Sequence, residues 1–441
     1  MSSRPNTALA APPDICVVGL GYVGLTLSAA LAQAGLSVLG YERQAAVCER
    51  LNQGCPHLQE PGVEQALRDH LGAGLRFTSE LPSELPPVVV LCVGTPFDPL
   101  TGAPDLEQVT AAVDALATRV TADHLVVMRS TVPVGTCRSL VLPALQRVCT
   151  GPRLAMCPER TIQGKALAEL RNLPQIVGGL DERSAARAEA LFRGLGVRTV
   201  RVSSLEAAEM VKLICNAHTD TIYGFGNEVA LMAEALGLDA LELIRAANLD
   251  YPRPDLCRPG YVGGACVTKD PYLLISSTAA RGYTPPMVAA ARQLNQSLPE
   301  RSARRVLARL AALGVPAGGA RVLVSGFAYK GVPETDDLRG SAAPPVLAVL
   351  RGAVGCLRGH DFALPPETLA AFGVEPVDLA AGFVDADAVL LLNNHPAYQR
   401  YDIQGLAATL GRPAVLYDAW GVYRDRPPSI AGVEYLELGR G

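Results

Sequence analysis

The stretch from 258 to 270, which reads Arg-Pro-Gly-Tyr-Val-Gly-Gly-Ala-Cys-Val-Thr-Lys-Asp, places one thiol among glycines and charges. Its three glycines let the backbone approach a ligand closely. Lys269 can favour the thiolate of Cys266, and Asp270 can orient neighbouring groups. A cysteine taken alone is more often a small, buried apolar side chain. This setting instead predicts that Cys266 is a nucleophile.

A glycine motif near the N-terminus predicts a dinucleotide site. An apolar run at 15–18 precedes Gly19-Leu-Gly21-Tyr-Val-Gly24, and a helical pattern and a second strand ending at Glu42 follow. Gly19 makes the tight turn, Gly21 admits a pyrophosphate to the helix N-terminus, and Gly24 allows close helix–strand packing. A glycine turn in another α/β protein is the alternative. Glu42 would hydrogen-bond a ribose diol and repel a 2′-phosphate, so we expect NAD, held by Gly19, Gly21, Tyr22, Val23, Gly24, Glu42, Arg43, Thr95 and Thr131.

Polar residues follow the next strands of the alternating pattern. The β-branched run 88–93 leads to Thr95, and the run 124–128 leads to Ser130 and Thr131. Ligands bind at the carboxyl ends of parallel strands, although a hydroxyl there is often only a helix cap. Glu159, in Cys-Pro-Glu-Arg at 157–160, is a candidate general base. A surface or salt-bridged carboxylate is the alternative reading of that residue.

One long helix is predicted from Ser203 to Leu236. Ser203-Ser-Leu-Glu206 has the form of a capping box, and apolar residues recur at three- and four-residue steps. Lys212 and Asn216 are four residues apart, so they share one face of this helix. Because their neighbours on that face are apolar, we expect both to point into a site. The helix should also bridge two domains and offer a surface for dimerisation.

A second α/β region follows the helical middle of the chain. Strands are expected at 321–325, 355–358, 388–392 and 414–417, and helices at 294–313 and 343–351. The fold class is therefore α/β, with two Rossmann-like doubly wound domains joined by a long central helix. We expect a flexible tail at 1–13, an NAD-binding domain at 14–202, a central helical domain with the cysteine loop at 203–312, and a C-terminal α/β domain at 313–441.

Composition narrows the classes of function. The 441 residues carry a formal net charge of −4, which gives no basic footprint for nucleic acid. The 11 cysteines are scattered without a Cys-x-x-Cys pair, which favours reduced thiols, a cytoplasmic location and no metal site. The first fourteen residues lack the apolar core of a signal peptide, and no apolar run reaches the roughly 18 residues of a membrane span.

These motifs resemble the UDP-glucose/GDP-mannose dehydrogenase family, in which they occur in the same order over roughly residues 14 to 420. The resemblance rests on Gly-Leu-Gly-Tyr-Val-Gly at 19–24, Ser-Thr-Val-Pro-x-Gly at 130–135, Cys-Pro-Glu-Arg at 157–160, Lys212 with Asn216, Gly-Tyr-Val-Gly-Gly-Ala-Cys-Val-Thr-Lys-Asp at 260–270, and Phe-Ala-Tyr-Lys-Gly with Thr-Asp-Asp-Leu-Arg at 327–339.

The resemblance implies a four-electron, NAD-dependent oxidation of the sugar C6 alcohol of a nucleotide sugar to a carboxylate. By the same resemblance Cys266 traps the aldehyde as a thiohemiacetal that becomes a thioester, and Glu159 assists its hydrolysis. Lys212 and Asn216 match the family's oxyanion-stabilising pair, while Thr131 and Asp270 match positions linked to an active-site water. The substrate-binding residues implied are Arg160, Lys212, Arg253, Gly263, Lys330 and Arg339, with Lys330 and Arg339 on the nucleotide side. The resemblance also implies that the C-terminal domain at 313–441 binds the UDP part of the nucleotide sugar.

The identity of the sugar is open, because the signals conflict. Cys-Pro-Glu-Arg and the Arg-Pro-Gly at 258–260 resemble the branch that acts on UDP-N-acetylhexosamines, UDP-GlcNAc or UDP-ManNAc. Thr268-Lys269 instead resembles the UDP-glucose form. An arginine of the UDP-glucose members is replaced by Asp250, although Arg253 is close by, and an Asp-x-Arg pattern is replaced by Asp418-Ala-Trp420.

Three hypotheses therefore stand. The first is the dehydrogenase, acting on a UDP-N-acetylhexosamine or alternatively on UDP-glucose, as a homodimer or higher homo-oligomer. The second is a catalytically lapsed protein that binds nucleotide sugars, which the departures at Asp250 and Trp420 suggest. The third is a two-electron dehydrogenase of the 3-hydroxyacid type, which would leave Cys266 without a task.

Overall fold

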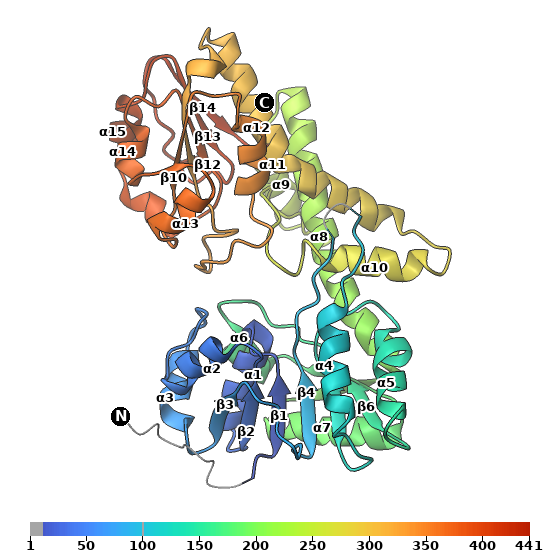
Figure 1. The fold of residues 1–441 in the computed structure, drawn as a ribbon. Coiled ribbons are helices and arrows are strands. Elements are labelled where there is room, and N and C mark those ends of the chain that lie inside the picture. Colours follow the sequence, from blue (N-terminus) through green and yellow to red (C-terminus); the bar gives the residue numbers. More distant parts are fainter. Residues whose placement is uncertain (1–11, 99–100) are drawn as a thin grey trace, which may run out of the picture. The chain divides into compact units, whose positions relative to one another are not determined.

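The structure is a computed structural model that describes residues 12–98 and 101–441 (Figure 1). Most of the predicted tail at 1–13 lies outside these residues. The chain forms two compact units: unit 1 comprises 1–215 and 272–284, and unit 2 comprises 216–271 and 285–441. The predicted division into domains at 202/203 and 312/313 stays a prediction. None of the helices in the described part is long and apolar enough to cross a membrane.

Unit 1 is built on one sheet with the strand order β3-β2-β1-β4-β5-β6-β7-β8. The first six strands in this order are parallel neighbours with the Rossmann order 3-2-1-4-5-6, and β6 pairs with β7 antiparallel. The strands are β1 (Ile15–Val18), β2 (Val38–Tyr41), β3 (Leu75–Thr78), β4 (Val88–Leu91), β5 (Leu125–Met128), β6 (Arg153–Met156), β7 (Gln175–Gly179) and β8 (Thr199–Val202).

Helices cover both faces of this sheet, because its central strands are apolar on both sides. All four residues of β1 and of β5 are buried. Separate apolar clusters form around Val17 and Val127 and around Val18 and Val126. The helices before the long one are α1 (Tyr22–Gln33), α2 (Ala45–Asn52), α3 (Val63–His70), α4 (Glu107–Ala117), α5 (Leu142–Gln146), α6 (Ala166–Asn172) and α7 (Glu182–Gly194).

The predicted long helix is α8, Leu205–Leu236, and it is uninterrupted. The capping interaction differs from the expectation in register: Ser204 Oγ accepts the N–H of Ala207 at 3.1 Å, one residue later than a box starting at Ser203. Two adjacent serines give the sequence two equivalent caps, and the helix start selects the second. Three helices follow, α9 (Ala240–Asn248), α10 (Asp270–Ala279) and α11 (Pro286–Ala312).

Helix α11 begins earlier than the predicted start at Leu294, because Pro286 occupies its first turn, where the missing N–H costs nothing. The units divide inside two of these helices: α8 and α10 each have residues in both units.

Unit 2 contains the second sheet, which is six-stranded, entirely parallel and ordered β11-β10-β9-β12-β13-β14. The order is again that of a Rossmann fold, which confirms the prediction of two doubly wound domains joined by a long helix. Its strands are β9 (Arg321–Ser325), β10 (Cys356–His360), β11 (Glu375–Pro376), β12 (Ala388–Leu391), β13 (Ala414–Asp418) and β14 (Val433–Glu437), with helices α12 (Ala343–Leu350), α13 (Pro366–Ala371), α14 (Leu379–Phe383) and α15 (Ile403–Ala408).

Candidate active site

The turn from β1 to α1 in unit 1 is shaped for a dinucleotide. Gly19 has a φ of +89°, which side chains rarely adopt. A Cβ on Gly24 would overlap the carbonyl oxygen of Gly19, so this glycine permits the close contact of helix and strand. Around Gly21, which caps α1, a Cβ would meet no atom within 4 Å. The open space beside the helix N-terminus fits a pyrophosphate.

Glu42, which the sequence predicts to bind a ribose, lies just after β2. Its Oε2 accepts the N–H of Leu20 at 3.1 Å, and its Oε1 accepts the N–H of Gln44 at 3.2 Å. The carboxylate is thereby fixed beside the glycine turn. Tyr22 and Val23 lie half-buried in the first turn of α1, and Arg43 is exposed. The residues present therefore fit NAD.

The loop after β5 carries Thr131 and is held from several sides. Thr95 donates from Oγ1 to the carbonyl oxygen of Thr131 at 2.6 Å. Glu209 on α8, which is buried, accepts the N–H groups of Gly135 at 2.5 Å and of Cys137 at 2.8 Å. Burial raises the pKa of Glu209 although these N–H groups act against the rise. The sequence motif had not identified Glu209 as the support of this loop.

Glu159 follows β6 and is a buried partner of Arg129, not a surface carboxylate. Its Oε2 accepts from the guanidinium of Arg129, while its Oε1 accepts the N–H groups of Arg160 and Thr161, each at 2.7 Å. Burial would raise the pKa of Glu159, but the charge of Arg129, the N–H of Thr161 and the charge of Lys212 outweigh it and lower that pKa. Glu159 is thus held as an anion.

Arg129 itself was missed by the sequence reasoning. It is 1% exposed, and its Nη1 also donates to Gln175 Oε1 at 2.9 Å and to the carbonyl oxygen of Cys157 at 3.2 Å. A charge directly after the apolar run 124–128 was the available signal, because such a charge needs a buried partner. Arg160, predicted to bind substrate, donates from its guanidinium to the carbonyl oxygen of Pro174.

The cysteine loop belongs to unit 2. Cys266 is exposed, and its carbonyl oxygen accepts the N–H groups of Lys269 at 3.1 Å and of Asp270 at 2.8 Å, so the nucleophile begins a tight turn that leads into α10. Asp270 is buried and binds two partners: Asn216 Nδ2 donates to its Oδ2 at 2.5 Å, and Lys269 Nζ lies 3.1 Å from its Oδ1. The structure therefore brings Asn216, Asp270 and the Cys266 turn together.

The glycines of this loop pack on the segment after β9. A Cβ on Gly263 would come within 2.7 Å of Gly340 O, and one on Gly264 within 2.8 Å of the Tyr329 ring. Gly264 donates its N–H to the carbonyl oxygen of Arg339 at 3.0 Å. The ammonium of Lys330 lies 5.2 Å from the centre of the Tyr329 ring. Of the predicted residues, Gly263 and Lys330 thus lie beside Tyr329, whereas the guanidinium of Arg339 pairs with Asp337 at 2.6 Å.

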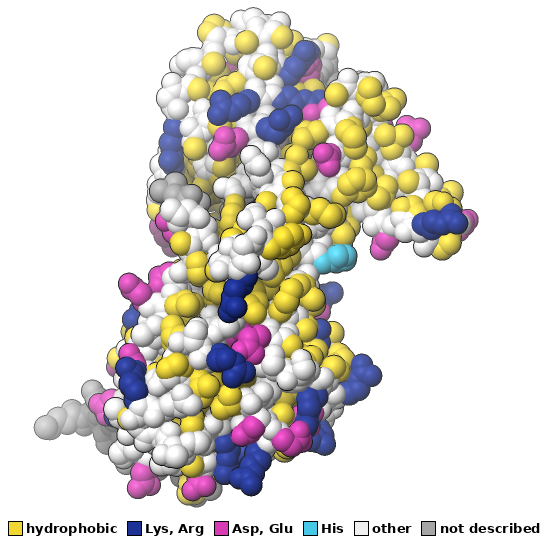
Figure 2. All heavy atoms as spheres, turned by 90° about the vertical axis from the view of Figure 1, so that its right-hand side faces the viewer, with side chains coloured by type: hydrophobic (Ala, Val, Ile, Leu, Met, Phe, Trp, Pro, Cys, Tyr) yellow, Lys and Arg dark blue, Asp and Glu magenta, His cyan; other side chains and the backbone are white. Residues whose placement is uncertain are grey.

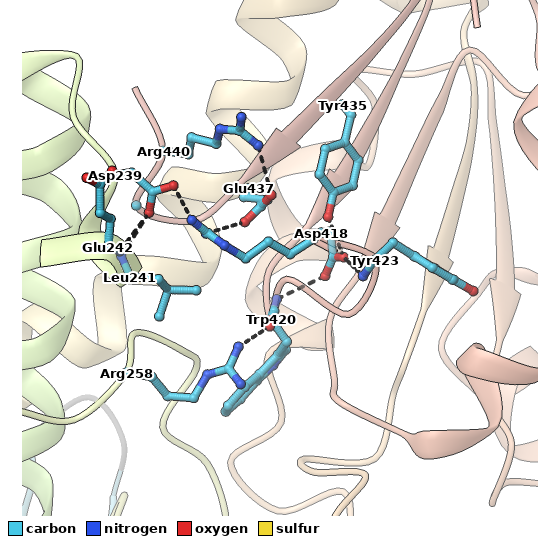
Figure 3. A network of polar contacts seen from close by, with 12 residues as sticks. Asp239, Leu241, Glu242, Arg258, Asp418, Trp420, Tyr423, Tyr435, Glu437 and Arg440 are labelled. Atoms are coloured by element: carbon cyan, nitrogen blue, oxygen red, sulfur yellow. Dashed lines mark hydrogen bonds and ion pairs between the residues drawn. The ribbon is translucent and has the colours of Figure 1, made fainter. Parts of the chain in front are cut away.

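The start of the loop rests on Trp420, one of the departures from the family pattern (Figure 3). Arg258 donates to the carbonyl oxygen of Trp420, and its guanidinium lies 5.9 Å from the centre of the indole ring. A Cβ on Gly260 would come within 2.6 Å of that ring. Trp420 is held by Asp418 Oδ1, which accepts the backbone N–H of Trp420 at 3.1 Å. Arg253, in contrast, contacts Tyr251.

The predicted residues are therefore divided between the units. Unit 1 holds the cofactor turn, Thr131, Glu159, Arg160 and Lys212, and unit 2 holds the cysteine turn, Asn216 and the nucleotide-side residues. Lys212 and Asn216 lie one turn apart on the continuous helix α8. In the described part of the chain, no group of three or more His, Cys, Asp or Glu side chains is arranged to hold a metal ion.

Comparison with known proteins assigns three consecutive regions of the chain. Residues 13–196 match the NAD-binding domain, 206–297 the central domain, and 323–425 the UDP-binding domain of the UDP-glucose/GDP-mannose dehydrogenase family. A UDP-N-acetyl-D-mannosamine dehydrogenase from Pyrococcus horikoshii is 31% identical over 97% of this chain and 99% of that protein. An NDP-N-acetyl-D-galactosaminuronic acid dehydrogenase from Ralstonia nicotianae is 30% identical over 89% of this chain and 93% of that protein.

Solved structures show the same fold. The structure of the UDP-D-ManNAc dehydrogenase from Pyrococcus horikoshii has a TM-score of 0.88 at 29% identity and covers 97% of this chain and 99% of that one. A UDP-glucose dehydrogenase from Pyrobaculum islandicum has a TM-score of 0.84 at 27% identity, with 100% of both chains covered.

Proposed function

Because the chain belongs to the UDP-glucose/GDP-mannose dehydrogenase family, we propose that it oxidises the C6 hydroxyl of a UDP-N-acetylhexosamine to the carboxylate in two NAD-dependent steps. The family makes it a nucleotide sugar dehydrogenase that uses NAD. The observation that carries the four-electron reaction is the exposed Cys266 on a turn fixed by Asp270 and Asn216. A two-electron enzyme would have no use for such a thiol.

The proposed chemistry gives each group one task. NAD, when bound, accepts the hydride of each oxidation step. The thiolate of Cys266 adds to the aldehyde carbon, and oxidation of the resulting thiohemiacetal leaves a thioester. Water then attacks the thioester carbon, which releases the carboxylate and returns the thiol. Lys212 and Asn216 donate toward the oxygen on which negative charge develops during both additions.

In the last step, the water molecule that attacks the thioester is assigned to Glu159, Thr131 and Asp270, which would bind and orient it. A carboxylate that accepts three hydrogen bonds and has a lowered pKa is a weak base, so Glu159 orients the attacking water and takes its proton only as the thioester breaks. Lys330 and Arg339 are assigned to the diphosphate. Gly263 is assigned to the substrate side of the loop, where its missing side chain lets the loop pack closely on Gly340 and Tyr329. Arg160 and Arg253 remain the proposed contacts to the sugar.

The choice of an N-acetylhexosamine rests on the relatives and on Arg160. Both compared relatives with 30% identity or more act, by their names, on N-acetylated hexosamine derivatives. UDP-GlcNAc and UDP-ManNAc are therefore the first substrates to test. UDP-glucose is the second candidate, favoured by Thr268-Lys269 and by the similarity to the Pyrobaculum islandicum structure.

The deciding experiment measures NADH formed per molecule of sugar nucleotide. UDP-ManNAc, UDP-GlcNAc, UDP-glucose, UDP-galactose and GDP-mannose are each supplied in limiting amount and followed to completion at 340 nm. Two NADH per UDP-N-acetylhexosamine are expected, and Cys266→Ser should abolish this yield. One NADH per substrate would leave Cys266 without its role, and binding without any NADH would make the protein a lapsed member of the family.

Two further features belong to the proposal. Met210, Ile214, Phe225, Met232 and Leu236 are exposed on α8, and at 100° per residue they fall within about 80° of one another. Figure 2 shows exposed apolar side chains on the face that it draws. An exposed apolar stripe on a helix favours a homodimer or larger assembly.

None of the 11 cysteines, all in the described part, is in a disulfide, which suits a reducing cytoplasm.

A further inference from the structure

Four polar side chains of unit 2 are almost completely buried between α8 and α11. Asp220 and Asn227 come from α8, and Arg292 and Asn295 come from α11; the largest exposed fraction among them is 3%. Burial of a polar or charged group is costly unless it is hydrogen-bonded, so a cluster of four calls for a reason. Helix packing alone would be served by apolar residues of similar size.

At one end of this cluster, Asn227 forms hydrogen bonds with Gly260, the first glycine of the cysteine loop. Asn227 donates from Nδ2 to the carbonyl oxygen of Gly260 at 3.0 Å and accepts the N–H of Gly260 on Oδ1 at 2.8 Å. One amide thus satisfies both backbone groups of the glycine. The same Nδ2 also donates to Oδ1 of Asn295 at 2.8 Å, which connects Asn227 to α11.

The other end reaches the residue after the nucleophile. Arg292 donates from Nη1 to the carbonyl oxygen of Val267 at 3.2 Å and to Asp220 Oδ1 at 2.7 Å. Asn295 connects the two ends of the hydrogen-bond network, because its Nδ2 donates to the same Oδ1 of Asp220 at 2.8 Å. The cluster therefore begins at Gly260 and ends at Val267, on either side of the loop that carries Cys266.

The cluster is not optimised for stability alone. Asp220 is fully buried, and burial raises its pKa although Arg292 and Asn295 act against the rise. Its Oδ2 has no hydrogen-bond partner among the described residues. Elsewhere on the same two helices Arg305 and Glu234 form an ion pair of the same kind, at 2.5 Å, and the other bonds of Arg305 go to the C-terminal segment and not to the loop. The fully buried pair is thus the one that holds the loop backbone.

We propose that Asp220, Asn227, Arg292 and Asn295 are positioning residues that clamp both sides of the cysteine loop and hold the Cys266 thiol in place for attack on the substrate. The inference rests on the proposed function, since it gives the loop a geometry that matters for covalent catalysis. A displacement of about 1 Å at a reacting atom can cost about a hundredfold in rate.

Arg292→Met tests the clamp at its charged end, in the full-length protein with the nucleotide sugar that wild type oxidises. We expect kcat to fall at least about thirtyfold, while KM for NAD, whose domain is in unit 1, changes less than about twofold. Arg292→Lys keeps one donor and should recover part of the loss. Amide hydrogen exchange in peptides covering 259–268 should become at least about tenfold faster in Arg292→Met.

Arg305→Met is the matched control, because it removes the same group from the same helix and also unpairs a carboxylate of α8. Its kcat and loop exchange should stay within about twofold of wild type. A folded Arg292→Met protein with a kcat within about threefold of wild type would overturn the clamp. The same holds if Arg305→Met loses as much activity as Arg292→Met does.

Asn227→Ala gives a second test should Arg292→Met fail to fold. It frees the N–H of Gly260 and should again speed loop exchange and lower kcat; unchanged exchange of the loop would refute the inference. The exchange measurement needs no turnover. A wild-type protein that oxidises no sugar nucleotide would therefore refute the proposed function. Amide exchange of the loop in the same variants would still support or refute the clamp.

Discussion

Glu159 illustrates how one residue is tuned by its neighbours. It accepts three hydrogen bonds, one of them from a guanidinium that is 1% exposed, and the net effect lowers its pKa although the residue is buried. Among the groups that lower this pKa, the charge of Arg129 has the largest effect. A carboxylate in this state can order a water molecule without being protonated at mildly acidic pH.

Arg129→Met should reverse the direction of this shift. With the guanidinium gone, burial raises the pKa of Glu159, and the acidic limb of the kcat profile should move toward neutral pH. In wild type the folded pKa lies below the unfolded one, so the pair stabilises the fold above about pH 4.3 and its contribution is lost as pH falls further. Losing the partner of a buried charge should also cost about 3–5 kcal/mol at pH 7.

The check is kcat at saturating substrate from about pH 5 to 9, with urea unfolding at pH 7. The double variant Arg129→Met/Glu159→Gln is the control, since it has no carboxyl left to titrate and should show no shifted limb. An acidic limb that stays where it is in Arg129→Met would mean that the ionisation of Glu159 does not control the rate.

Which residues could be predicted depends on how far apart their partners are in the chain. Cys266 and the glycines at 19–24 lie in short motifs, so their surroundings can be read locally. Arg129 and Glu159 are 30 residues apart, and Asp220 and Arg292 are 72 apart. Such pairs depend on which strands and helices become neighbours, and a single sequence does not carry that information in a local pattern.

At the scale of elements, the turn between β1 and α1 allows a glycine needed for packing to be tested separately from one proposed to bind the cofactor. Gly24→Ala would drive a Cβ into the carbonyl oxygen of Gly19, so we expect a clear loss of Tm and of NAD affinity together. Gly21 has a φ of −69° and open space around it, so Gly21→Ala should fold with a Tm close to wild type.

The same Gly21→Ala protein should bind NAD at least about tenfold more weakly, because its methyl group stands where the pyrophosphate approaches the helix N-terminus. Thermal unfolding and calorimetric titration with NAD measure the two effects in both variants. If Gly21→Ala bound NAD as tightly as wild type does, the pyrophosphate would not bind at this turn.

Strands were predicted better than helix ends, for a physical reason. A buried parallel strand is a short apolar run with sharp limits, and β9 and β12 begin at the predicted residues, 321 and 388. Helix ends depend on caps and on tertiary packing. The choice between Ser203 and Ser204 as the cap of α8, and the start of α11 at Pro286, are set by backbone hydrogen bonds that the apolar periodicity does not contain.

At the scale of the whole molecule, the two units share the Rossmann strand order but not the glycine motif. In unit 2 Gly326 has a φ of +97° after β9, and Asp361 after β10 accepts the N–H groups of Phe327 at 2.6 Å and of Ala328 at 2.9 Å. Gly19 and Glu42 have the corresponding places in unit 1. Because unit 2 lacks Gly-x-Gly-x-x-Gly, this correspondence could be inferred only from strand order, once the sheet was known.

The remaining prediction concerns assembly. Phe225 is 50% exposed at the middle of the apolar stripe on α8, so Phe225→Glu places a charge where two copies would meet. We expect wild type to be a dimer or larger by light scattering after gel filtration, and the variant to be a monomer at the same concentration, because a buried unpaired carboxylate opposes association. Val148→Glu is the control: Val148 is 53% exposed but lies outside α8, so the oligomeric state should not change. A wild-type monomer, or a dimer unaffected by Phe225→Glu, would show that the stripe has another use.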